Sequence, residues 1–193
     1  GTFRSATVAA QDFPNADIRV IDTRLIAGGL GAVVKQAVEW ANAGLAPDEI
    51  ISRVHAMCAR HRIYFMVDTL EYLYKGGRIG AAKALFGSLL QVKPILTFRD
   101  GNIEPFESQR THKRAMARLK EVVLADCPRD SSSFLSIMHG DAEAEAMQYA
   151  SEFSAQLGIP LSDIAIYDLT PAILVHSGPG VIAVSFFVQP SQA

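Results

Sequence analysis

Residues 63–80 read IYFMVDTLEYLYKGGRIG, and this stretch decides how the chain is divided. Its first five residues form a compact apolar run of strand length, and Asp68-Thr69 can cap a short helix that extends through Tyr74. The paired glycines that follow predict a flexible junction, because glycine adopts backbone angles that other residues avoid. We therefore predict that a new α+β domain begins at Ile63 and occupies residues 63–193.

The preceding segment, residues 1–62, predicts the order helix, strand, helix, helix. A helix over 2–12 ends at Pro14, and residues 18–21 (IRVI) are predicted to form a strand. Apolar residues three and four apart predict a helix over 30–41, and Pro47 opens another that extends to Cys58. Because the chain starts at Gly1 without Met and enters a helix at once, we expect residues 1–62 to be the C-terminal part of a truncated α/β domain.

Beyond residue 80, predicted strands and hairpins are mixed with helices. The clearest signal is Asp100-Gly101, a dipeptide typical of a tight hairpin turn between two strands. The expected helices cover 81–90, 111–125 and 146–157, and the expected strands cover 63–67, 93–98, 103–109, 134–138, 164–169, 173–175 and 182–188. This mixture predicts an α+β layer with a mixed sheet, so the whole chain is assigned to the α/β class with two domains.

The composition excludes several classes of protein. Of 193 residues, 49% are hydrophobic, which is enough for a core, and the formal net charge of −2 argues against a nucleic-acid-binding protein. Cys58 and Cys127 lie in no zinc-ligand pattern, and they favour a reducing, cytoplasmic setting. No apolar run approaches the roughly 20 residues that a membrane-spanning helix needs.

Two glycine-containing segments are candidates for anion binding. In the first, YKGGRIG (74–80), Lys75 and Arg78 flank the glycines and could bind an anion; on the residues alone, a helix C-cap with solvated charges is the better interpretation. In the second, VHSGPGV (175–181), His176 follows a predicted strand and could donate a hydrogen bond to a carboxylate. Backbone N–H groups of Ser177, Gly178 and Gly180 could complete an anion nest. A plain reverse turn with an incidental histidine explains the second segment equally well.

A basic cluster, QRTHKR (109–114), lies at a predicted strand-to-helix junction, where cations oppose the helix dipole and favour an anionic partner. The other histidines are weaker candidates: His55 and His61 are predicted on a helix surface, and His139 at a strand end before an N-cap at Asp141. The sequence contains no nucleophile elbow, zinc-protease motif or dinucleotide fingerprint, so binding groups are clearer than catalytic ones.

Several segments in this order resemble the DegV family of bacterial fatty-acid-binding proteins. They are GTFRSA (1–6), DTLEYLYKGGRI (68–79), LLQVKPIL (89–96), Asp100-Gly101, Arg110 and HSGPG (176–180). The resemblance covers essentially the whole chain. It implies two α/β domains with a long-chain fatty acid between or inside them, and it implies that the first third of the usual protein, which carries a carboxylate-binding Thr/Ser motif, is absent or supplied by a separate chain.

The resemblance also implies roles for individual residues. His176, with Ser177, Gly178 and Thr2, is expected to contact the carboxylate of the fatty acid. Arg110 and Arg78 are expected to face a partner fatty acid kinase and its phosphate. Apolar tunnel walls are expected from four residues for which ordinary core packing is the simpler interpretation: Ile79, Phe86, Leu89 and Leu90.

These observations leave three hypotheses open. The first is a cytoplasmic lipid carrier without cofactor or catalysis of its own, which contacts membrane surfaces transiently and presents its fatty acid to a kinase. The second is a small-molecule hydrolase or phosphotransferase that uses His176 as acid and base. The third is a protein-interaction module in which the lipid is a structural filler. The absence of a recognisable nucleophile or metal site favours the carrier.

Overall fold

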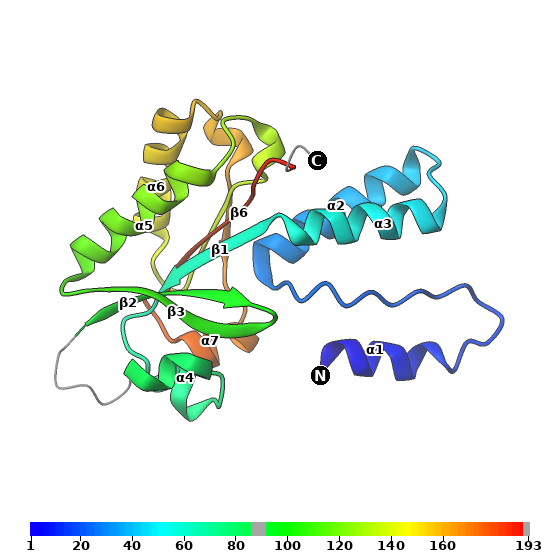
Figure 1. Ribbon diagram of the computed structural model, residues 1–193, viewed down its shortest axis with the longest axis horizontal. Helices are drawn as coiled ribbons and strands as arrows, with labels where there is room; N and C mark the ends of the chain where they lie inside the picture. The colour runs from blue at the N-terminus through cyan, green and yellow to red at the C-terminus, as the bar shows by residue number, and fades with distance from the viewer. Residues whose placement is uncertain (86–91, 191–193) are drawn as a thin grey trace.

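The computed structural model describes residues 1–85 and 92–190, and its centre is a six-stranded mixed sheet (Figure 1). The strand order is β3-β2-β1-β6-β4-β5. Strands β4 and β5 are parallel, whereas the other neighbouring pairs are antiparallel. The strands are β1 (His61–Met66), β2 (Lys93–Arg99), β3 (Asn102–Gln109), β4 (Ser136–His139), β5 (Ala165–Asp168) and β6 (Ile182–Phe187). The predicted α/β class with a mixed sheet is confirmed.

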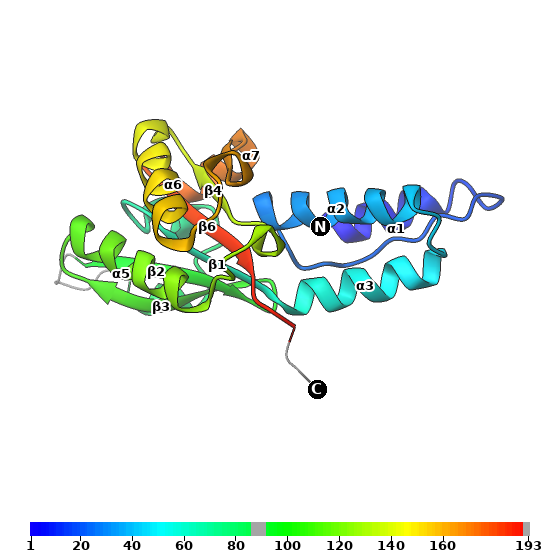
Figure 2. The same cartoon turned by 90° about the horizontal axis from the view of Figure 1, so that it is seen from above.

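Helices cover both faces of this sheet and extend beyond one end of it (Figures 1 and 2). The α-helices are α1 (Thr2–Ala10), α2 (Ala27–Asn42), α3 (Pro47–Ala59), α4 (Glu71–Lys75), α5 (His112–Asp126), α6 (Glu143–Leu157) and α7 (Pro171–Ser177). The 3-10 helices are η1 (Gly80–Leu85), η2 (Ser131–Ser133) and η3 (Leu161–Asp163). None of the helices in the described part of the chain is long and apolar enough to cross a membrane.

The two faces of the sheet are packed differently. Alternate residues of β1 point to opposite faces, so Tyr64 and Met66 join the core under α5 and α6, whereas Ile63 and Phe65 join a second core beside α4, η1 and α7. Both sets are buried because β1 is a central strand covered on both sides. The second face is the one that carries the candidate site.

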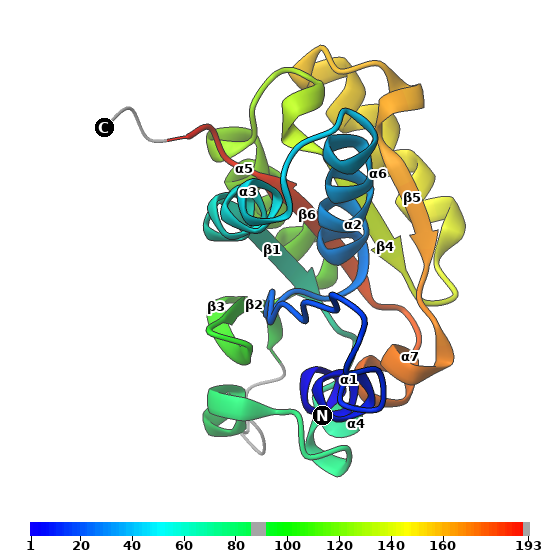
Figure 3. The same ribbon diagram turned by 90° about the vertical axis from the view of Figure 1, so that its right-hand side faces the viewer.

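Helices α2 and α3 form an antiparallel pair with a small core of their own, built on Val33, Val54, Met57 and Phe187. The view in Figure 3 shows this pair side by side, with α1 below it. Helix α1 buries none of its residues, and its Phe3 is 44% exposed. The N-terminal part of the chain is therefore attached to the sheet mainly through α2 and α3.

The start of α2 lies directly against the sheet because Gly28 and Gly29 leave room for it. A Cβ on Gly28 would lie 2.4 Å from Oγ of Ser136, and one on Gly29 would lie 2.2 Å from Nε2 of His61. Both glycines are buried. A larger residue at Gly28 would clash with the Ser136 side chain on β4, and one at Gly29 with the His61 ring on β1, so that either that side chain or the start of α2 would have to shift.

Several local predictions are confirmed by the structure. Asp100 and Gly101 have φ angles of 51° and 78° in the turn between β2 and β3, as a type I′ hairpin requires. The helix predicted over 111–125 is present as α5, and the structure adds a cap that was not predicted, since Thr111 Oγ1 accepts a hydrogen bond from the Arg114 N–H at 3.2 Å. The division into domains at residue 62 stays a prediction.

Four other predictions need correction or restriction. Residues 18–21 form no strand, because no described strand lies beside them, and Arg19 is instead bound by Asp17 and Asp48. Residues 173–175 belong to α7 rather than to a strand, since Pro171 starts a helix there. Asp141 does not cap α6, whose N-cap is Ala142. Of the helix expected over 81–90, the structure describes only the part in η1.

His61 was expected on a helix surface and instead begins β1, where it is mostly shielded from solvent. Its Nε2 lies 2.8 Å from Oγ of Ser185 on the neighbouring strand β6. Burial, and secondarily the charge of Arg62, lowers the pKa of His61 to about 4. The sequence prediction failed here because α3 ends at Ala59, and the next residues already pair with β6.

Candidate functional site

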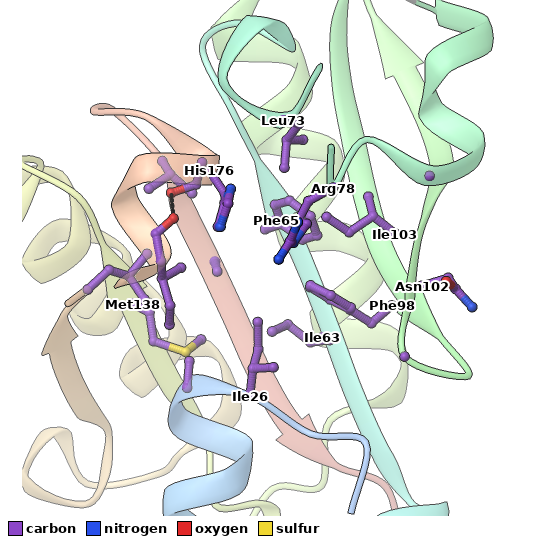
Figure 4. Close-up of a pocket in the computed structure, with 18 of the residues that line it drawn as sticks. Ile26, Ile63, Phe65, Leu73, Arg78, Phe98, Asn102, Ile103, Met138 and His176 are labelled. Atoms are coloured by element: carbon purple, nitrogen blue, oxygen red, sulfur yellow. Dashed lines mark hydrogen bonds between the residues drawn. The ribbon is translucent and has the colours of Figure 1, made fainter. Parts of the chain in front are cut away.

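A cavity of about 370 Å³ opens on the second face of the sheet, between strands β1 and β3, helices α4 and α7 and the start of α2 (Figure 4). Its volume lies within the range of small-molecule sites, about 300–1,000 Å³. The walls are predominantly apolar and include Ile63, Phe65, Leu73, Phe98, Ile103 and Met138. The cavity can therefore shelter an apolar ligand from water.

Two of the polar residues that line this cavity, His176 and Arg78, lie near the ends of α7 and α4, whereas Asn102 lines it at the hairpin between β2 and β3. His176 and Ser177 form the last turn of α7, and Arg78 follows α4, so that His176 and Arg78 lie on facing sides in Figure 4. Arg78 Nη1 donates to the carbonyl of Gly76 at 3.0 Å. The part of the cavity near Ile26 and Met138 is apolar. The arrangement suits a molecule with a polar head and a hydrocarbon tail.

The glycine loop after α7 does not form the predicted anion nest. The N–H of Gly178 donates to the carbonyl of Leu174 at 2.8 Å, and the N–H of Gly180 donates to the carbonyl of Gly140 at 2.7 Å. These donors are therefore occupied within the protein. The Ser177 hydroxyl is also engaged, with the carbonyl of Ile173 at 3.4 Å. His176 and Arg78 are left as the principal side chains that could receive an anionic group.

The structure brings some of the predicted site residues together and separates others. His176, Ser177 and Arg78 line the cavity. Ile79 is buried in the core beside it, and Gly178 packs against the ring of Tyr72. The remaining residues do not line it in the part of the chain that is described: Thr2 is exposed at the start of α1, Arg110 is exposed between β3 and α5, and Phe86, Leu89 and Leu90 lie outside the described residues. All of these assignments stay predictions.

Sequence reasoning missed the residues that form most of the cavity wall. Ile63 and Phe65 alternate along β1, and Phe98 lies on β2 with its ring stacked on Phe65 at 5.5 Å between centroids. The uninterrupted apolar run IYFMV was a usable signal for a strand buried on both faces. Which face of the strand borders a cavity depends on where α4, α7 and α2 pack, and the local sequence pattern carries no information about their packing.

A second, more polar cavity of about 740 Å³ adjoins the first. The two share Ile26, Ile63, Phe98 and Gly101. Charged side chains line the second, including those of Arg62 and Arg99. The apolar cavity and the polar one therefore border each other along these shared residues.

The only hydroxyl among the described residues that line the cavity is that of Ser177, and it donates to the carbonyl of Ile173. Among the described residues that line it, there is no carboxylate or cysteine. Over the same part of the chain, no group of three potential metal ligands occurs. Another histidine, His139, is buried, but its Nδ1 lies 3.8 Å from Oδ1 of Asp168, too far for a hydrogen bond, and it does not line this cavity.

Comparison with known proteins agrees with this geometry. A family model described as "Uncharacterised protein, DegV family" matches residues 1–189. A DegV domain-containing protein of Streptomyces coelicolor is 40% identical over 185 residues, which cover 95% of this chain and 64% of that protein. The present chain thus spans slightly less than two thirds of that relative.

Solved structures show the same fold. A DegV family protein from Thermus thermophilus, described by its fatty acid binding, is 29% identical with a TM-score of 0.86, over 98% of this chain and 67% of that one. DegV from Bacillus subtilis, described as a fatty acid binding protein, is 32% identical with a TM-score of 0.82, also over 98% and 67%. Both likenesses extend over nearly every residue of the present chain.

Proposed function

Because this chain belongs to the DegV family, we propose that it binds a long-chain fatty acid in the cavity beside His176 and presents the carboxylate to a partner kinase. The observation that carries the proposal is the polarity of the cavity, whose walls are mostly apolar and in which His176 and Arg78 face each other near the ends of α7 and α4. A fatty acid likewise combines an apolar tail with a polar head. The fatty acid binding described for the two related structures supports the same ligand class.

Burial of the hydrocarbon tail supplies the driving force. At about 0.8 kcal/mol per methylene, a tail of about 14 methylenes contributes roughly 11 kcal/mol, which is an upper value. For a fatty acid that comes from a bilayer, the same burial offsets the apolar contacts that the tail gives up on leaving the membrane, so that uptake during a transient contact is not opposed by exposure of the tail to water. The stacked rings of Phe65 and Phe98 give one wall a flat apolar surface for the chain.

The carboxylate is the difficult end of the ligand, since burying it without hydrogen-bond donors costs several kcal/mol. His176 can donate one hydrogen bond, and the Arg78 guanidinium adds a positive charge on the facing side. Arg78 is exposed, so the head end of the cavity is accessible from solvent. We propose that a kinase transfers phosphate to the carboxylate from this side and that the chain itself only holds the acid.

The two free thiols, Cys58 and Cys127, favour a reducing compartment, so we also propose a cytoplasmic location. Arg110 is proposed to belong to the surface that the kinase contacts. It is exposed and lies outside the cavity lining, as a residue that touches the partner rather than the ligand would.

The test is stearate binding by the full chain, measured by titration calorimetry on wild type, His176→Ala and Arg110→Ala. We expect His176→Ala to weaken binding by about tenfold or more, the usual effect of losing a hydrogen bond to a charged group. Arg110→Ala should bind stearate like wild type but give less acyl phosphate when a fatty acid kinase and ATP are added. A wild-type chain that does not bind stearate would refute the carrier proposal, and equal affinities would remove His176 from the site.

A further inference from the structure

Gly76 lies at the C-terminal end of α4, in direct contact with the imidazole of His176. A Cβ built on Gly76 would lie 2.2 Å from Nδ1 and 3.0 Å from Cε1 of that ring. Separations below 3 Å do not occur between real atoms of this kind, so a side chain at position 76 and the present ring position exclude each other. The ring of His176 can occupy its place only because residue 76 has no side chain.

The backbone does not explain the glycine at this position. Gly76 has a φ angle of −76° and a ψ of −5°, which any residue adopts. Its neighbour Gly77 has a φ of 66°, where glycine is favoured, and the space around its own Cβ position is open. Of the two adjacent glycines, Gly77 is therefore required by the backbone conformation of the turn, whereas Gly76 is required by the packing of the His176 ring.

A reciprocal contact fixes the other side of the same junction. Gly178, which ends α7 with a φ of 76°, packs against the ring of Tyr72, and a Cβ there would lie 2.4 Å from Tyr72 Cδ2. Tyr72 of α4 thus packs on Gly178 at the end of α7, and His176 of α7 packs on Gly76 at the end of α4. The two contacts together set the position of the last turn of α7.

Contact with Gly76 also determines which nitrogen of His176 carries the proton in the neutral ring. Nδ1 is buried, and it has no hydrogen-bond partner in residues 1–85 and 92–190. A proton on Nδ1 would be a buried donor directed at the Gly76 methylene, whereas a lone pair on Nδ1 can accept a weak contact from its C–H group. The proton therefore belongs on Nε2, which makes that nitrogen the donor.

We propose that Gly76 is a positioning residue for ligand binding: it seats the imidazole of His176 against α4 and holds it as the Nε2–H tautomer, which donates to the fatty-acid carboxylate. The inference rests on the function proposed above for the role of the carboxylate. It adds the residue that fixes the orientation and protonation pattern of the donor. Arg78 then supplies the charge, and His176 supplies a directed hydrogen bond.

The substitution Gly76→Ala separates this role from folding. Alanine fits the backbone angles of residue 76, and its Cβ meets the carbonyl oxygen of Tyr72 at 3.0 Å, a contact that a small shift relieves. The movable neighbour is the His176 ring, which must rotate away. The matched control is Gly31→Ala on the exposed side of α2, where a Cβ meets nothing within 4 Å. Gly31→Ala should unfold at or above the wild-type temperature, since alanine restricts the unfolded chain more than glycine does, and Gly76→Ala should still unfold cooperatively, because only one ring and a small backbone shift must accommodate its Cβ.

The experiment is a double-mutant cycle of stearate affinity on the full chain, with wild type, Gly76→Ala, His176→Ala and the double variant. We expect Gly76→Ala to lower affinity by about tenfold, the double variant to match His176→Ala, and Gly31→Ala to match wild type. In parallel, nitrogen NMR of the unliganded wild type should show the neutral His176 ring protonated at Nε2, and Gly76→Ala should change that signal.

Additive losses in the cycle would overturn the proposal, because they would mean that Gly76 acts without His176. A neutral ring protonated at Nδ1 in the wild type would overturn it as well. If the wild type failed to bind stearate, the proposed carrier function would be refuted. The NMR comparison of wild type with Gly76→Ala would still show whether Gly76 determines the position and tautomer of the His176 ring. The two failures are therefore distinguishable.

Discussion

Acid should destabilise this protein through His61, the residue at which β1 meets the start of α2. The ring is mostly buried, with Nε2 hydrogen-bonded to Ser185 and the ring centroid 5.1 Å from that of Phe187. Burial lowers its pKa from 6.5 to about 4, with a smaller contribution from Arg62. A protonated His61 would place an additional charge against Gly29 and the first turn of α2.

The sign of the effect follows from which state binds the proton. Between pH 6.5 and about 4, the unfolded chain protonates His61 while the folded chain keeps it neutral, so the free energy of unfolding falls as the pH falls. Above pH 6.5 the ring is neutral in both the folded and the unfolded chain, so the free energy of unfolding is not reduced by His61 there. At about 1.4 kcal/mol per pKa unit, the loss reaches about 3 kcal/mol by pH 4, as an order of magnitude.

The assay is urea unfolding of wild type and His61→Gln at about pH 7.5 and about pH 4.5, extrapolated to water. Glutamine can keep the hydrogen bond to Ser185 but does not titrate. Carboxylates whose pKa is lowered by cationic partners, such as Glu152 beside Lys120, also lose stability in acid, but they do so in both proteins. We expect wild type to lose about 2–3 kcal/mol more than His61→Gln between the two conditions. Equal losses would refute the assignment of a depressed pKa to His61.

Two further predictions concern the hairpin and the cap of α5. Gly101→Val should lower the free energy of unfolding by about 1–2 kcal/mol, because a β-branched residue is strained at a φ of 78° even though nothing lies within 4 Å of the added Cβ; urea unfolding measures this, and an unchanged midpoint would contradict it. Thr111→Ala should cost about 1 kcal/mol through loss of the hydrogen bond from the Arg114 N–H, whereas Thr111→Ser should stay close to wild type in the same assay. Equal destabilisation by alanine and serine would show that the cap is not responsible.

Sequence patterns predicted the elements whose signals are local. The turn at Asp100-Gly101 and the helix predicted over 111–125 depend on neighbouring residues in the chain, and the structure confirms them. Residues 18–21 have strand-forming side chains, but a strand also needs a partner, and no described strand lies beside them. The run of three apolar residues at 173–175 was too short to distinguish a strand from a helix.

The candidate site shows the same limit at the level of tertiary structure. His176 and Arg78 could be singled out from their glycine-containing segments, because those segments are unusual in themselves. Their position across one cavity depends on α4 packing against α7, and the chain separates the two helices by nearly a hundred residues. The sequence alone likewise offered a C-cap as the explanation of Gly76, whereas its contact with the His176 ring requires the folded chain.

The difference between the two faces of the sheet has an evolutionary consequence. The face beneath α5 and α6 is filled by residues such as Leu119 and Phe153, and large losses of stability follow when such residues are truncated. The opposite face contains the cavity, where side chains such as Phe98 are only partly enclosed and border empty space. Exchanges among the residues of that wall can therefore alter which molecules fit the cavity, while the filled core on the other face keeps the chain folded. Descendants of such a protein can diversify in what they bind without first acquiring a new scaffold.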